Sequence, residues 1–129
     1  MLSLIRKLII AIAVVTVISG VVQAIAPAFI LGLVHAEIDP TTTQAFAIVG
    51  FFMALFGGLL IQCLAFGPPV LPGVLWSGLQ KVGASAAVFI GIHRGVFSGF
   101  AAAVASFDGL SAVLILGYYW AVRRAGIIP

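Results

Sequence analysis

Two charged side chains interrupt long apolar stretches of this 129-residue chain and are the first candidates for chemistry. Lys81 lies eleven residues before the end of one stretch, and Asp108 lies ten residues after the start of the next. In helices that cross a bilayer, at about 1.5 Å per residue, both would lie roughly 15–17 Å below the same surface. An unpaired charge at that depth costs about 2.5–3.5 kcal/mol even on lenient scales. We therefore expect an ion pair between Lys81 and Asp108.

Gln23 falls at a similar depth in the first apolar stretch, and small residues such as Ser85 and Gly109 flank the two charges at helical spacing. Small neighbours would allow the polar side chains to meet inside a bundle, where Gln23 would join the ion pair. Buried ionisable residues in membranes commonly form proton or ligand sites. The alternatives are a structural ion pair that fixes helix register, or a Lys81 side chain that extends to the nearer water surface.

Two histidines form a second candidate cluster. His35 and His93 each end an apolar stretch on the same predicted side of the membrane, with Glu37 and Asp39 near by. Two imidazoles and a carboxylate can hold Zn or Cu, and two imidazoles can ligate a haem axially. The histidines do not follow a metal-binding spacing such as HxxxH or HExxH, and solvated histidines at a membrane interface are the alternative interpretation.

The sequence contains no arrangement typical of catalysis. It has no GxSxG motif, no phosphate-binding loop and no nucleophile beside a base. The single cysteine, Cys63, lies in an apolar run and excludes an intrachain disulfide and a cysteine-based metal motif. We expect a small buried hydrophobic side chain at Cys63 and predict that the protein is not an enzyme.

The composition indicates what surrounds the chain. Hydrophobic residues make up 64% of the sequence and charged residues 7%, whereas a soluble domain has roughly 25% charged residues. The chain therefore cannot cover a water-facing surface, and we expect the lipid bilayer to be its solvent. The formal net charge of +3 comes from basic residues at segment ends, so nucleic-acid binding is not expected.

Four apolar stretches are long enough to cross a bilayer, which takes about 20 helical residues. They run approximately over residues 8–34, 44–66, 74–92 and 98–122. The runs are continuous and not alternating, which favours helices over a β-barrel. The sequence predicts one all-α domain over residues 1–129, a bundle of four transmembrane helices in a polytopic integral membrane protein. Pro27 lies inside the first stretch and is expected to kink or tilt it.

The distribution of Lys and Arg predicts the orientation. Four basic residues fall on one side of the membrane, namely Arg6, Lys7, Arg123 and Arg124. Only Arg94 falls on the other side, and Trp76 and Trp120 lie where interfacial anchors are common. We predict a multi-pass protein of the cell (inner) membrane with both termini in the cytoplasm. The first stretch is too long for the core of a signal peptide and is read as a retained helix.

The layout resembles a known group of proteins. Four short spans, together with the segments GLQKVGA at residues 78–84 and FDGLSA at residues 107–112, are similar to small bacterial four-helix membrane proteins of the DoxX-like kind. The resemblance covers the whole chain in layout and these two segments in sequence. Members of that group are associated with redox or respiratory accessory roles or have no assigned role, and the resemblance carries no catalytic residue over to this chain.

Three functions remain open from the sequence. The first is an accessory or scaffolding subunit that packs in the bilayer against other membrane-protein subunits or against copies of itself, because almost no part of the chain lies outside the membrane. The second is a carrier of a small molecule or a proton that uses Lys81 and Asp108. The third is an electron-transfer component that binds haem or a quinone and uses His35 and His93.

Overall fold

The computed structural model describes residues 1–126, and this part of the chain is helical with no strand. The helices are α1 (Leu2–Ile25), α2 (Pro27–Leu33), α3 (Pro40–Ala65), α4 (Leu71–His93) and α5 (Ala101–Arg124). Four of them, all except α2, are long and apolar enough to cross a membrane. The predicted all-α fold with four membrane-spanning helices is therefore confirmed.

The first apolar stretch forms two helices, so the predicted span over residues 8–34 is wrong. α1 begins six residues earlier, at Leu2, and ends at Ile25, and α2 follows from Pro27. Proline lacks an N–H group and disfavours helical geometry in the residue before it. Ala26 accordingly leaves the helical region, with φ −129° and ψ 61°. Pro27 thus separates the two helices and does not kink a continuous one.

The other three helices lie within four residues of the predicted spans at each end. α3 begins at Pro40 because Asp39 caps it, accepting hydrogen bonds from the backbone N–H (2.9 Å) and the hydroxyl (2.8 Å) of Thr42. The backbone hydrogen bond is the larger cause of a lowered pKa at Asp39. α3 ends where Gly67 adopts φ 109° ahead of two prolines.

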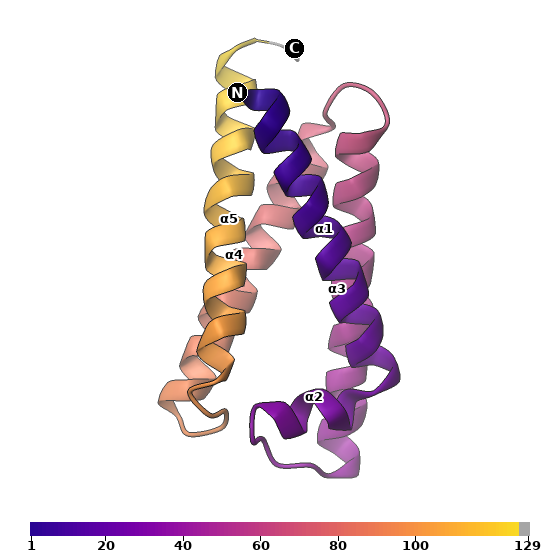
Figure 1. The fold of residues 1–129 in the computed structure, drawn as a ribbon, viewed down its shortest axis with the longest axis vertical. Coiled ribbons are helices and arrows are strands. Elements are labelled where there is room, and N and C mark those ends of the chain that lie inside the picture. Colours follow the sequence, from indigo (N-terminus) through magenta and orange to yellow (C-terminus); the bar gives the residue numbers. More distant parts are fainter. Residues whose placement is uncertain (127–129) are drawn as a thin grey trace.

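α1 packs along α3, and α4 packs along α5, so the molecule consists of two helix pairs (Figure 1). Glycines set the approach of α1 to α3. A Cβ atom at Gly20 would lie 2.5 Å from the carbonyl oxygen of Gly50, and one at Gly50 would lie 2.7 Å from the backbone nitrogen of Ala24. The first pair therefore depends on backbone contact between these two glycines.

The second pair confirms the predicted contact between the last two spans. The hydroxyl of Ser85 on α4 donates to the carbonyl oxygen of Ala105 on α5 at 2.8 Å. Near the other end of these helices, a Cβ atom at Gly78 would lie 2.6 Å from Leu116 Cδ2. Small residues on α4 thus make room for α5, as the sequence pattern indicates.

The two pairs converge at the end where α1 begins and α5 ends, here called the terminal end, and diverge towards α2, here called the α2 end (Figure 1). The hydrophobic core lies at the terminal end. It comprises Ile9, Ala13, Leu60, Cys63, Leu64, Val74, Ile115, Tyr118, Tyr119 and Val122. Arg6 strengthens this end, since its Nε donates to the carbonyl oxygen of Leu64 at 2.6 Å. The pairs are therefore held together mainly on one side of the membrane-spanning region.

α2 lies across the wide end of the molecule, between the diverging pairs (Figure 1). The backbone N–H of Ser98, in the loop between α4 and α5, donates to the carbonyl oxygen of Val34 at 2.8 Å. This hydrogen bond connects the segment after α2 to the second helix pair. The helical break at Pro27 thus supplies the element that bridges the gap at this end.

Candidate functional site

The Lys81 and Asp108 side chains meet between α4 and α5, as an ion pair with 3.0 Å between Lys81 Nζ and Asp108 Oδ1. Both residues are buried, with 3% and 6% of their surface exposed. The close packing of α4 on α5 positions them, because Asp108 lies next to Gly109, where a Cβ atom would come within 3.0 Å of Ser85 Oγ. We call this arrangement the central ion pair.

Lys81 has a second acceptor on the other helix pair. Its Nζ donates to Thr16 Oγ1 on α1 at 2.7 Å. Thr16 can accept this bond because its own hydroxyl donates to the carbonyl oxygen of Ile12 at 2.9 Å. The ring of Phe107 lies 5.3 Å from Lys81 Nζ, within the range of a cation–π interaction. Lys81 therefore links the two pairs as well as α4 to α5.

Gln23 does not join the central ion pair, contrary to its proposed place there. Its amide nitrogen donates to the carbonyl oxygen of Phe46 on α3 at 3.1 Å. The depth of Gln23 was inferred from a span over residues 8–34, whereas α1 ends at Ile25. The middle of the real helix lies closer to Thr16, about 10 Å from Gln23 at 1.5 Å per residue. Thr16 consequently takes the position expected for Gln23.

A cavity of about 200 Å³, here called the central cavity, lies between the helix pairs on the α2 side of the ion pair. Its polar lining comes from Gln23, Gln80 and Asp108. The remaining lining residues are apolar: Ile30, Val34, Phe46, Val49, Met53, Ala84, Ala87, Val88, Phe97, Ala101 and Val104. These apolar residues come from α2, α3, α4, α5 and the loops after α2 and before α5, and α1 contributes Gln23. Gln23 thus shares this cavity with Asp108 without contacting Lys81.

Asp108 is among the residues that line the central cavity, whereas Lys81 is not. Oδ1 accepts the hydrogen bond from Lys81. Within residues 1–126, Oδ2 accepts no hydrogen bond, so it is free to accept one from a molecule in the cavity. The cavity therefore combines an apolar wall with a hydrogen-bond acceptor and two side-chain amides at one end.

The sequence reasoning did not identify Thr16 and Gln80 as part of this site. Thr16 has the ordinary features of a helical threonine, whose hydroxyl bonds back to its own helix. Gln80 lies beside Lys81, and its role depends on which way α4 faces. The position of Gln80 next to Lys81 on the same helix could have indicated that Gln80 lies near the site. Identifying Thr16 would have required the correct limits of α1.

The two histidines lie at the α2 end, both exposed. His35 follows α2 with a φ of 54°, and His93 is the last residue of α4. In the described part of the chain, no three His, Cys, Asp or Glu side chains gather in a group that could hold a metal ion. The haem or metal assignment of His35 and His93 stays a prediction.

The predicted anchor residues lie at the terminal end. Trp76 and Trp120 are 62% and 56% exposed, as expected for side chains at a lipid interface. Lys7 and Arg124 are also exposed. Arg123 donates to the hydroxyl of Tyr119 at 2.9 Å and lies 5.7 Å from the Trp120 ring centroid.

Comparison with known proteins gives no assignment. No family model matches the chain, no curated protein matches it, and no solved structure matches it. The resemblance to DoxX-like proteins therefore stays a prediction from the layout and the two short segments.

Proposed function

We propose that this protein is a carrier that binds a small amphipathic molecule between its two helix pairs. The observation that carries the proposal is the central cavity, whose lining includes the buried residue Asp108. Its volume of about 200 Å³ lies below the roughly 300–1,000 Å³ of pockets for drug-sized ligands. The ligand is therefore small, with an apolar body and one polar group.

The polar group of the ligand is a hydrogen-bond donor such as an alcohol or a phenol. Asp108 Oδ2 is an acceptor, and the charge of the carboxylate is already balanced by Lys81. A neutral donor adds a hydrogen bond to a charged group without adding a charge. Such bonds contribute about 1.5–3 kcal/mol. The apolar part of the ligand would fill the cavity and pack against side chains such as Val49 and Val104.

Binding of 2-naphthol to the protein in mild detergent, compared with binding of naphthalene, tests this proposal. The two probes have the same rings and differ in one hydroxyl group. We expect 2-naphthol to bind at least about tenfold more tightly, the ratio that corresponds to about 1.4 kcal/mol. The fluorescence of the probe measures both affinities.

A matched pair of variants distinguishes binding of the probe in the central cavity from its partition into the detergent micelle. Ala87 lines the central cavity, whereas its neighbour Ala86 faces a shallow hollow on another side of α4. We expect Ala87→Phe to abolish the preference for 2-naphthol and Ala86→Phe to retain it. Equal behaviour of the two variants would contradict the proposal, and neither substitution disturbs the charges.

The accessory-subunit role stays a prediction from the sequence. Gly58, Gly83 and Gly117 lie on helix surfaces with open space around them, which suits close approach by helices of another subunit or another copy. Stoichiometric co-purification of a second membrane protein in mild detergent would support that role and is compatible with a ligand in the cavity.

A further inference from the structure

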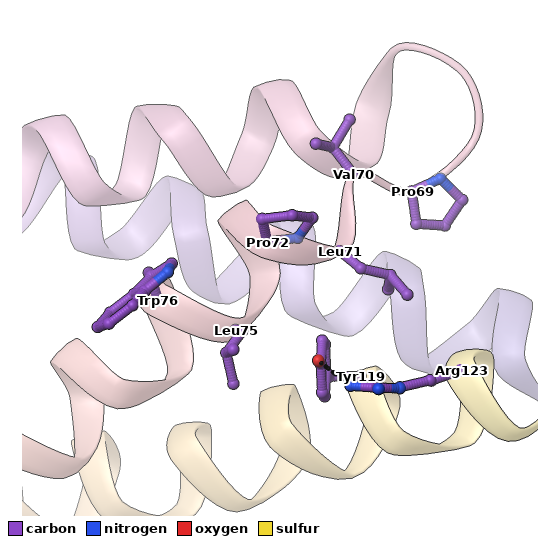
Figure 2. A pocket seen from close by; sticks show the side chains of 8 residues that line it. All are labelled: Pro69, Val70, Leu71, Pro72, Leu75, Trp76, Tyr119 and Arg123. Atoms are coloured by element: carbon purple, nitrogen blue, oxygen red, sulfur yellow. Dashed lines mark hydrogen bonds between the residues drawn. The ribbon is translucent and has the colours of Figure 1, made fainter. Parts of the chain in front are cut away.

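A second hollow, unrelated to the central cavity, lies at the terminal end and is here called the terminal groove. It has a volume of about 500 Å³ and is formed by the loop before α4, the first turns of α4 and the last turns of α5 (Figure 2). Pro69, Leu71, Leu75 and Trp76 supply apolar walls, and Arg123 lies at one end. The groove and the central cavity share no lining residue.

The polar groups of the terminal groove are donors. Arg123 uses one of its five N–H donors on the hydroxyl of Tyr119 (Figure 2). Tyr119 is 7% exposed, and in the described part of the chain its own O–H has no acceptor. The first turn of α4 has no side-chain cap, so its free backbone N–H at Leu71 and the helix dipole add further positive potential.

The charge of the surroundings has the same sign. Arg6, Lys7, Arg123 and Arg124 belong to the terminal end. All three acidic residues of the chain, Glu37, Asp39 and Asp108, lie elsewhere. An anion in the groove would therefore meet no nearby negative side chain and would satisfy the buried O–H of Tyr119.

We propose that the terminal groove binds one phospholipid with an anionic headgroup. The phosphate accepts hydrogen bonds from Arg123 and Tyr119, and an acyl chain lies along Leu75 and Trp76. Charge complementarity selects the headgroup, because Arg123 is the charged side chain that lines the groove and Tyr119 still has an O–H to donate. The apolar wall selects a lipid over a free phosphate, since inorganic phosphate would leave Leu75 and Trp76 without a partner.

Trp76 itself reports occupancy of the groove. The chain has two tryptophans, so the Trp120→Phe variant keeps only Trp76 and retains an aromatic ring beside Arg123. In this background, reconstituted into phosphatidylcholine vesicles, quenching of Trp76 by added brominated phosphatidylglycerol is compared with quenching by brominated phosphatidylcholine. We expect the anionic lipid to quench at about tenfold lower mole fraction.

Two adjacent arginines provide the matched control. Arg123→Gln removes the donor from the groove, whereas Arg124→Gln removes the same charge one residue away, at a position that does not line the groove. We expect the preference for phosphatidylglycerol to fall about tenfold in Arg123→Gln and at most about twofold in Arg124→Gln. Tyr119→Phe, a conservative change, should reduce it partially.

Three outcomes would overturn the proposal. Equal losses in the two arginine variants would mean that only the general charge of the terminal end attracts the lipid. Equal quenching by the two brominated lipids in the unmodified groove would mean that no headgroup is selected. Relief of quenching by millimolar inorganic phosphate would show that the anion, and not the lipid, is the ligand.

Discussion

Lys81 is the residue whose burial most needs a physical explanation. Its ammonium donates to Asp108 at 3.0 Å and to Thr16 at 2.7 Å, and the ring of Phe107 covers it at 5.3 Å. These contacts offset part of the cost of removing the charge from water. A buried ion pair nevertheless contributes little net stability over apolar residues of similar volume. The net contribution of the central ion pair to folding is therefore expected to be small.

Replacement of the central ion pair tests this view. We expect Lys81→Met alone, and Asp108→Leu alone, to destabilise the fold by about 3–5 kcal/mol, because each leaves an unpaired buried charge. The double variant should approach or exceed the wild-type stability. Since Cys63 is the only cysteine and is 5% exposed, its reaction with a thiol-reactive dye on heating measures unfolding. A double variant as unstable as the single variants would count against this account.

At the scale of helices, backbone contact between glycines decides how α1 meets α3. Gly50 touches Ala24, Gln23 and Gly20, and a Cβ atom there would come within 2.7–2.8 Å of all three. Gly58 belongs to the same helix and has nothing within 4 Å of the corresponding position. The two glycines therefore differ in packing while sharing the same local cost in helix propensity.

A pair of alanine substitutions separates these effects. We expect Gly50→Ala to lower the free energy of unfolding by about 1–3 kcal/mol, because the added methyl group forces the helices apart. Gly58→Ala should raise it by up to about 1 kcal/mol, as alanine favours a helix over glycine. The Cys63 reaction on heating measures both changes. Equal effects would show that Gly50 is not a packing contact.

The helices show what the sequence could and could not specify. Prolines, glycines and the Asp39 cap mark the limits of α3, α4 and α5, so local chemistry was sufficient there. The first span was wrong because hydrophobicity continues past Pro27, so apolar length alone joins α1 to α2, whereas the proline separates them. The pairing of α1 with α3 depends on Gly20, Gly50 and Gly57, each of which lies against the backbone of the facing helix. Which residues face each other across the pair cannot be read from either helix alone.

The candidate site likewise combines residues that the sequence predicts together with residues that only tertiary packing brings in. Lys81 and Asp108 were predicted together because both are charged and lie at equal depth from a shared turn. Equal depth on adjacent helices is a local property, fixed by the short loop between α4 and α5. Thr16 and Gln23 lie on a helix from the other pair, so their positions depend on tertiary packing, which the sequence does not express locally.

At the scale of the whole molecule, the first turn of α1 and the last turn of α5 lie at one end (Figure 1). Four basic residues belong to this end, and Arg94 lies at the other. By the bias of basic residues towards the cytoplasm, we expect the terminal end to face inwards. Cysteines introduced at Ser3, on the terminal end, and at Glu37, on the α2 end, test the orientation.

Intact bacterial cells that express these variants are treated with a membrane-impermeant maleimide. We expect Glu37→Cys to be labelled within minutes and Ser3→Cys only after the membrane is permeabilised. The wild-type chain serves as the background control, because its one thiol is buried. Labelling of Ser3→Cys in intact cells would reverse the orientation and place the terminal groove in the opposite leaflet.

The divergence of the helix pairs gives the molecule a wedge-shaped outline along the membrane normal. Such an outline takes up more area in the leaflet at the α2 end than in the leaflet at the terminal end. The narrow end holds the packed core and the Arg6 contact to α3. Widening or narrowing of the other end therefore changes the area of one leaflet alone, and the work of that change depends on how tightly the lipids there are packed.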